Sequence, residues 1–162
     1  MATIDMATLE GQGNHPAADG QNRIYVIESV VDIAEAVTAK GSALAADDVI
    51  EALNVPVGSQ VLAGGVEVME AVTGTATNVT IDVGVTGGDV DGMVDGFDLD
   101  GAAAGAITGG GVGTVVTVNA TDTIDILIAT QTGTLLTGKV RVFATINFVR
   151  IFYVNDLSKF NK

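Results

Sequence analysis

Five aspartates lie close together between Gly87 and Gly101, separated by glycine and apolar residues: Asp89, Asp91, Asp95, Asp98 and Asp100. Carboxylates on a glycine-containing backbone offer the hard oxygen ligands that Ca²⁺ prefers. The spacing does not match an EF-hand, because counting from Asp89 or Asp91 places Met93 at a ligand position. Two interpretations stay open, a non-standard calcium site and a solvated turn whose aspartates cap the backbone. We expect the second and name no metal ligand.

Side chains suited to covalent or acid–base catalysis are sparse. His15 is the single histidine, and it lies in a polar, glycine-containing stretch. No serine has the context of an activated nucleophile, whether Ser29, Ser42, Ser59 or Ser158. With 20 acidic residues, some pair of carboxylates falls at the spacing of a glycosidase active site by chance. Such a pair therefore does not indicate glycoside hydrolysis. We therefore expect no enzyme, no catalytic residue and no cofactor-binding residue.

The charge balance narrows the classes of partner. Seven Lys and Arg residues against 20 Asp and Glu give a net charge of -13, which argues against nucleic acid and anionic membranes. The glycine run Thr108–Thr114 lacks the lysine of a phosphate-binding loop, and we expect a closely packed or flexible loop there. There is no cysteine, so disulfides and thiolate metal sites are excluded. No apolar run approaches a membrane span, and the first 16 residues do not resemble a secretory signal.

The hydrophobic pattern has a period of two, which is typical of half-buried strands. Val79, Ile81, Val83 and Val85 form one apolar row, and Ile124, Ile126 and Ile128 form another. Val49, Glu51, Leu53 and Val55 read as a third row, ended by Pro56. Further strands are expected over 23–31, 60–73 and 114–119. We predict an all-β protein, an antiparallel β-sandwich or jelly roll of about eight strands.

Three segments are distinguished along the chain. Residues 1–22 are predicted to be an extended N-terminal arm, 23–154 the β-sandwich domain, and 155–162 a C-terminal tail. The Gly64-Gly65 pair predicts a bulge or a close backbone approach within a strand. Asp32–Lys40 fits either a short helix or a continuation of the preceding strand, and Gly41 ends it. A short helical turn is also expected near Asp89 or Asp91.

The last predicted strand, 139–154, changes its apolar face. Val140, Val142, Ala144, Ile146 and Phe148 share one face, whereas Val149, Ile151 and Tyr153 share the other. A one-residue slip predicts a bulge or bend near 148–150. Most aromatic residues lie in this part of the chain, and both a core role and a subunit-interface role stay open. Five of the seven cations lie at or after Lys139, so we expect the acidic part to face solvent and the C-terminal segment to face a partner.

The stretch 41–61 contains Leu44-Ala45-Ala46-Asp47-Asp48-Val49-Ile50 before the Pro56 turn. It resembles a segment of small virion structural proteins of tailed, marine podovirus-like bacteriophages. Residues 83–89, the aspartate loop to Gly101, and 122–143 are similar to the same group. The resemblance covers 23–149 and implies a β-sandwich capsid decoration or head accessory protein in many copies. It implies no catalytic residues.

These observations predict a phage virion structural protein. We expect a capsid decoration or cement protein that binds the head surface, formed by the major capsid protein, through strand addition and apolar contacts. Self-association, as a homotrimer, would cover the remaining sheet edges. We expect synthesis in the host cytoplasm and a final location on the capsid surface of the virion. The alternatives are another virion component (head fibre, tail tube or adaptor) and a calcium-dependent glycan or cell-surface binding module.

Overall fold

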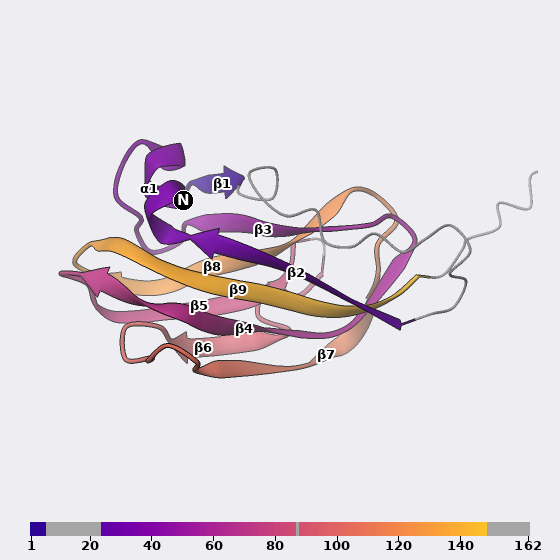
Figure 1. The fold of residues 1–162 in the computed structure, drawn as a ribbon. Helices are drawn as coiled ribbons and strands as arrows, with labels where there is room; N and C mark the ends of the chain where they lie inside the picture. Colours follow the sequence, from indigo (N-terminus) through magenta and orange to yellow (C-terminus); the bar gives the residue numbers. More distant parts are fainter. Residues whose placement is uncertain (6–23, 87, 149–162) are drawn as a thin grey trace, which may run out of the picture.

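The computed structural model describes residues 1–5, 24–86 and 88–148, and it shows two β-sheets packed face to face (Figure 1). The described residues form one helix, α1 (Ile33–Lys40), and nine strands: β1 (Thr3–Asp5), β2 (Ile24–Asp32), β3 (Val49–Val55), β4 (Ser59–Gly74), β5 (Thr77–Val85), β6 (Val94–Asp98), β7 (Ile107–Thr117), β8 (Asp122–Thr132) and β9 (Leu135–Phe148). The prediction of an all-β, mainly antiparallel sandwich is confirmed.

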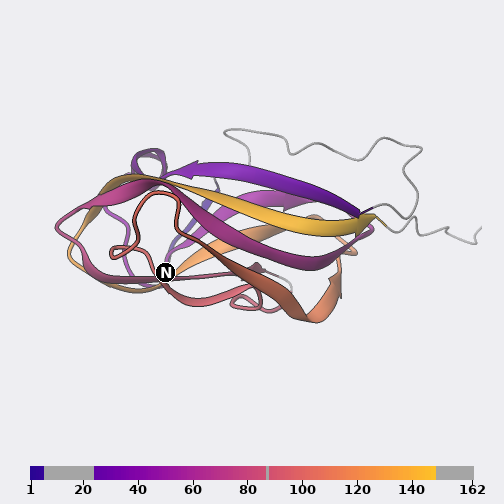
Figure 2. The same ribbon diagram turned by 60° about the horizontal axis from the view of Figure 1, so that its bottom comes forward.

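The strand order identifies the sandwich as a jelly roll. One sheet has the order β1-β3-β8-β5-β6 and the other β2-β9-β4-β7, and in Figure 1 the β2-β9-β4-β7 sheet lies in front of the other. Figure 2 shows the same two sheets after a turn of 60°. The antiparallel pairs β2–β9, β3–β8, β4–β7 and β5–β6 are nested, as in one long hairpin of eight strands rolled into two layers. β1 is an addition to this plan and pairs in parallel with β3.

The core consists of the period-two rows between the sheets. The row on β5, Val79 to Val85, and the row on β8, Ile124 to Ile128, are at most 2% exposed, as predicted. On β9, the predicted face from Val140 to Ile146 is fully buried. Each row faces the other sheet because alternate side chains of a strand point to the same side. The predicted bend at 148–150 lies outside the described residues.

Two strands depart from the expected pattern. The predicted row on β3 is wrong in its first half. The register of β3 against β8 shifts between Glu51 and Leu53, and this shift changes which face of the strand points to the core. The buried residues are therefore Ile50 and Ala52 before the bulge, and Leu53 and Val55 after it. The predicted loop over 108–114 is also wrong, since these residues belong to β7.

The chain between β2 and β3 forms a helix. The side chain of Asp32 caps α1 by accepting hydrogen bonds from the backbone N–H groups of Ala34 (2.9 Å) and Glu35 (3.4 Å). Gly41 ends the helix in a left-handed conformation, at φ 75°, and its N–H donates to the carbonyl oxygens of Val37 and Thr38. The second helical turn is absent from the described residues near Asp89, where Gly92 N–H instead closes a turn on the Asp89 carbonyl.

A buried carboxylate joins α1, β1 and β3. Asp48 accepts hydrogen bonds from the N–H groups of Ala2 and Ala45, each at 2.9 Å, and forms an ion pair with the Lys40 ammonium group. Burial raises the pKa of Asp48, but the Lys40 hydrogen bond and the two backbone N–H groups outweigh it, and the net pKa is lowered. The first residues of the predicted arm are thus tied to the sandwich. Residues 6–22 lie outside the described part, and the boundaries of the arm and tail stay predictions.

A second buried carboxylate predicts a stabilising substitution. Asp125 on β8 is 6% exposed, and its Oδ1 atom has no hydrogen-bond partner among the described residues. Burial raises its pKa, although the Thr86 and Thr123 hydroxyls partly oppose this. A raised folded-state pKa means that ionising Asp125 destabilises the fold at neutral pH. We expect Asp125→Asn to raise the free energy of unfolding by about 1 kcal/mol at pH 7, measured by urea denaturation.

The pH dependence provides the control for this substitution. Relative to Asp125→Asn, the wild type should gain stability as the pH falls from above the folded-state pKa toward the unfolded value of about 3.9. The exposed Asp95→Asn variant should show neither effect. Equal stability of wild type and Asp125→Asn across this range would contradict the assignment.

Candidate assembly surface

β2 is an edge strand with an apolar side chain on each face. It lies at the end of its sheet, so one long side has no strand partner among the described residues. Ile27 and Val31 point into the core, whereas Ile24, Val26 and Val30 point outward and are 66%, 59% and 43% exposed. The strand contains neither proline nor lysine, the residues that commonly protect exposed edges. This is the kind of edge that pairs with another chain.

Sequence inspection identified this strand but not its surface role. Apolar residues on both faces are typical of a strand that is covered on both sides. In the segment 24–31 that signal is present, since Ile24, Val26 and Val30 alternate with the core residues. Among residues 1–5, 24–86 and 88–148, nothing covers the second face of this strand enough to bury Ile24, Val26 and Val30.

The chain enters β2 and leaves β9 at the same end of the sandwich. Ile24 is opposite Asn147 in the β2–β9 ladder, and Phe148 is opposite Ser59 in the β4–β9 ladder. Figures 1 and 2 both show the start of β2 beside the end of β9. The described chain therefore resumes at Ile24 and ends at Phe148 at the same corner of the sandwich. His15, Phe152, Tyr153 and Phe160 lie outside the described residues.

An ion-pair network crosses the outer face of this sheet. The Arg141 guanidinium on β9 donates to Glu28 on β2 at 2.8 Å and to Glu67 on β4. Its carbon atom Cζ lies 5.7 Å from the centre of the Phe143 ring. The Glu67 hydrogen bond is the main cause of the raised pKa of Arg141. Lys139 likewise pairs with Asp32 at 3.4 Å. Two of the cations that we expected to face a partner are thus bound within the chain.

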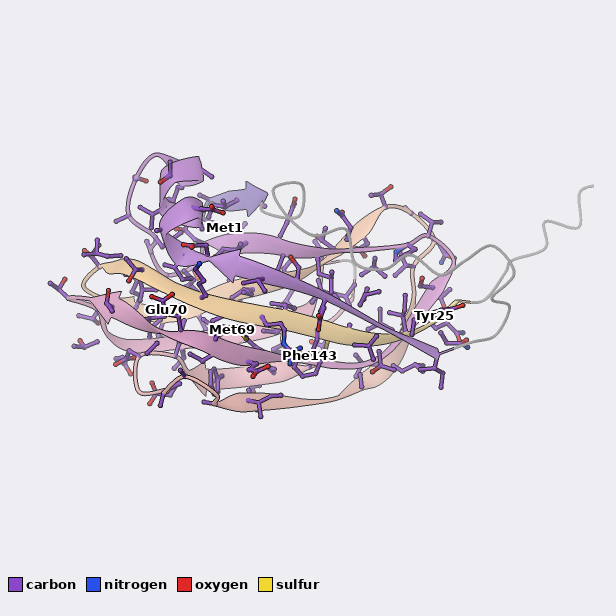
Figure 3. All side chains as sticks on the ribbon, in the orientation of Figure 1. Met1, Tyr25, Met69, Glu70 and Phe143 are labelled. Atoms are coloured by element: carbon purple, nitrogen blue, oxygen red, sulfur yellow. The ribbon has the colours of Figure 1, made fainter. Side chains whose placement is uncertain are left out.

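Beside this network lies a shallow hollow of about 520 Å³ with a glycine floor. In the β4–β7 ladder Gly64 is opposite Gly110, and Gly65 is opposite Gly109. A Cβ atom on Gly65 would lie 2.2 Å from the Thr108 carbonyl oxygen and 2.9 Å from the Phe143 ring. The predicted close approach at the double glycine is confirmed, while the bulge is two residues earlier, at Leu62. Figure 3 shows Phe143 on the sheet face that is turned toward the viewer.

Two aspartates of the loop 89–100 accept hydrogen bonds from backbone N–H groups. Asp98 accepts a hydrogen bond from Gly101 N–H at 3.0 Å, and Asp100 accepts one from Val79 N–H. The side chains of Asp89 and Asp91 interact with each other, and this hydrogen bond raises the pKa of Asp89. Within 1–5, 24–86 and 88–148, no three His, Asp or Glu side chains are placed to hold a metal ion. The contacts of Asp98 and Asp100 are of the capping kind, because each carboxylate accepts from a backbone N–H group.

The serines are not arranged for catalysis in the described part of the chain. Ser29 and Ser59 are buried, and the Ser59 hydroxyl has no hydrogen-bond partner there. Ser42 is exposed after α1. Ser158 and His15 lie outside the described residues, which contain no histidine to act as a base.

No described helix is long and apolar enough to cross a bilayer.

Two solved capsid structures contain chains with this architecture. A chain of the cyanophage Pam1 capsid asymmetric unit aligns with a TM-score of 0.58 and 21% identity, covering 87% of this chain and 96% of that one. A chain of the Ralstonia phage GP4 capsid aligns with a TM-score of 0.62 and 16% identity, covering 90% and 97%. This chain shares their fold. No protein-family model and no curated protein sequence matches it.

Proposed function

We propose that this chain is a structural protein of a phage virion, and specifically a capsid decoration or cement protein without enzymatic activity. The observation that carries the proposal is the likeness to two phage capsid chains over nearly the full length of each. The exposed apolar side chains Ile24, Val26 and Val30 on β2, an edge strand of the described sheet, support it, because apolar surface of this kind is suited to assembly.

The proposed mechanism is non-covalent attachment to the head surface formed by the major capsid protein. Strand addition would provide main-chain hydrogen bonds, and the outer face of the β2–β9–β4–β7 sheet would provide apolar contacts. Self-association, most simply as a homotrimer, would let each copy cover an edge of its neighbour. Several weak contacts per ring would then act together through avidity. The arm (1–22) and the segment after β9 are the proposed contact elements.

Binding to heads that lack the protein tests this function. We expect the purified chain to bind such heads. We expect replacement of 6–22 by a glycine–serine linker of equal length, or deletion of 150–162, to weaken binding at least tenfold in co-sedimentation; residues 1–5 are kept because Ala2 and β1 contact the sandwich. Cryo-EM of the particle should place the density on the outside of the shell. Undiminished binding by both variants would reject the attachment mechanism. Density on a head fibre, tail tube or adaptor would instead identify a different virion component.

A further inference from the structure

We infer that two copies of this chain pair through the outer edge of β7, antiparallel to each other about a two-fold axis at Gly109. The inference rests on the proposed assembly role and specifies one contact between copies. The pairing would join the two β2-β9-β4-β7 sheets into one continuous sheet. The same described strand acts on both sides of the contact, so no other segment of the chain is needed.

β7 is an edge strand whose backbone is open to solvent. It pairs with β4 and with no other strand of 1–5, 24–86 and 88–148, and Figure 1 shows it along the lower margin of the front sheet. Gly109, Gly110 and Gly111 are exposed and have no side chains to shield their peptide groups. The ladder with β4 is regular over 107–111, and this is the part to which a second strand can add.

The hydrogen bonds at the start of the β4–β7 ladder indicate which peptide groups face outward. Val68 N–H donates to the Ala106 carbonyl oxygen at 2.8 Å, so the Ala106 carbonyl points toward β4. Hydrogen-bonded and non-hydrogen-bonded positions alternate along an antiparallel ladder. The peptide groups that point away from β4 are therefore those of Ile107, Gly109 and Gly111.

The close approach of the two strands agrees with this assignment. Facing Cα atoms lie nearer to each other at non-hydrogen-bonded positions than at hydrogen-bonded ones. Gly109 is opposite Gly65, and a Cβ atom on Gly109 would lie only 2.7 Å from the Gly65 Cα atom. The Gly109 N–H and C=O groups are thus free to bond with an added strand.

These outward positions are self-complementary about a two-fold axis. When Gly109 lies opposite Gly109 of the second copy, Ile107 of each copy lies opposite Gly111 of the other. All of these are hydrogen-bonded positions, so the pairing provides about six main-chain hydrogen bonds. The contact uses the same patch on both copies and is therefore isologous, which limits it to two copies.

The side chains fit the same register. Ile107 is 60% exposed, whereas Gly111 has no side chain. Within one chain Gly111 lies opposite Ala63, which lines the shallow hollow beside Phe143. Ile107 of the second copy would therefore extend over Gly111 into this hollow, and the reciprocal contact would cover Ile107 of the first copy.

Charge also favours this edge over the others. The chain has a net charge of -13, so two copies repel each other wherever acidic residues meet. β7 contains no charged residue and no proline, which are common means of keeping sheet edges apart. The other edge strands of the two described sheets carry acidic residues, namely Asp5 on β1, Glu28 and Asp32 on β2, and Asp95 and Asp98 on β6.

The pairing is expected to be weak in solution. A ladder of five residues on each copy buries less than the roughly 1,200 Å² of a standard interface. It is separate from the ring contact of a homotrimer, which is heterologous, and it joins copies two by two. On a shell that holds many copies, such a contact would add to the others through avidity.

Mixed oxidation of single-cysteine variants tests the register. The chain has no cysteine, so Ile107→Cys and Gly111→Cys each carry one thiol. In the proposed pair these positions face each other with Cα atoms about 5.5 Å apart, which suits a disulfide. We expect a disulfide-linked pair when the two variants are mixed and oxidised.

Each variant alone is the internal control. Two copies of the same variant would hold their thiols about 13 Å apart along the strands, too far for a disulfide. Leu136→Cys in place of Gly111→Cys should also give none, because Leu136 is exposed on β9 and lies outside the contact. Absence of the mixed disulfide, or equal yields from each variant alone, would overturn the inference.

Sedimentation tests the contact without a cross-link. We expect the wild-type chain to form species with an even number of copies as its concentration rises. Ile107→Glu should weaken this association about tenfold or more, because each hollow would then receive a carboxylate. Leu136→Glu is the matched control, since it makes the same change at a side chain that is 52% exposed, and it should associate like the wild type.

A wild type that stays monomeric or purely trimeric, or equal association by Ile107→Glu and the wild type, would overturn the inference. Both experiments use the chain without heads. Failure of the pairing would therefore leave the head-binding result unchanged, and failure of head binding would leave the pairing result unchanged.

Discussion

Replacement of Asp48 with alanine is expected to lower the free energy of unfolding by about 3–5 kcal/mol. The Asp48 side chain is 3% exposed and its partner Lys40 is 15% exposed, so removal of the carboxylate leaves a largely buried ammonium group without its counter-ion, although it still donates to the Ala43 carbonyl oxygen at 2.7 Å. It also removes the acceptor for the N–H groups of Ala2 and Ala45. The carboxylate thus loses three contacts at once, with the last residue of α1, the residue before β1 and the loop between α1 and β3. Urea denaturation followed by circular dichroism measures the effect.

A double-mutant cycle separates the ion pair from the backbone contacts. Lys40→Met and Asp48→Asn should each be destabilising, and the double variant should lose less than the sum of the two. The exposed Asp95→Ala is the control for removing a carboxylate and should change stability by less than about 0.5 kcal/mol. A loss below about 1 kcal/mol for Asp48→Ala would show that the ion pair is not a structural clamp.

The same site contributes to acid sensitivity. Because the folded-state pKa of Asp48 is lowered, its contribution to stability is present above the unfolded value of about 3.9 and is lost as the pH falls through the folded value. The pKa of Asp125 is shifted the other way, so its contribution to stability increases as the pH falls. The difference in stability between wild type and Asp48→Ala should therefore shrink only in strongly acidic solution.

Replacement of Gly109 with alanine is the second large effect that we expect. A Cβ atom there would lie 2.3 Å from the Gly64 carbonyl oxygen and 2.7 Å from the Gly65 Cα atom. Both contacts are with backbone, so relief requires β4 and β7 to separate rather than a side chain to turn. Overpacking of this kind costs about 1–3 kcal/mol. Thermal denaturation of the variant should show a clearly lower midpoint.

Gly111 provides a control in the same strand and on the same face. A Cβ atom on Gly111 meets nothing closer than the Leu62 carbonyl oxygen, at 3.7 Å. Gly111→Ala should therefore be neutral or should stabilise the fold by about 0.5 kcal/mol, since alanine is less costly than glycine to order in a strand. Equal effects of the two substitutions would contradict the proposed backbone contact.

Much of the architecture is predictable from periodicity. The rows on β5, β8 and β9 alternate strictly, and each is buried as its pattern predicts. A period of two fixes which face of a strand is buried, but not which strand lies next to it. The pairing of β2 with β9 joins residues more than a hundred positions apart. Local sequence carries no direct signal for such a contact.

The errors have local physical causes. The bulge places the neighbouring residues Ala52 and Leu53 both in the core, so a strict period of two assigns the wrong residues to the buried face before it. The glycine run in β7 has low strand propensity, yet it forms a strand because β4 presents two glycines opposite it. The ion pairs of Arg141 and Asp48 depend on side chains brought together by the fold.

The candidate surface was only partly predictable. The proposal of an assembly role for the segment after β9 rests on its aromatic and basic composition. The proposal for β2 rests on its position at the sheet edge, which only the strand order reveals.

The nested strand order also means that β2 leaves the ribosome long before its partner strand β9 is synthesised. Ribosomes add about 5–20 residues per second, so roughly ten seconds separate the emergence of Ile24 from that of its ladder partner Asn147. During that interval β2 has neither its sheet neighbour nor a core to cover Ile27 and Val31. Nascent chains on one polysome therefore expose apolar strands without sheet partners to one another before any chain can fold. Slower elongation should increase aggregation of this protein more than that of a fold built from local contacts.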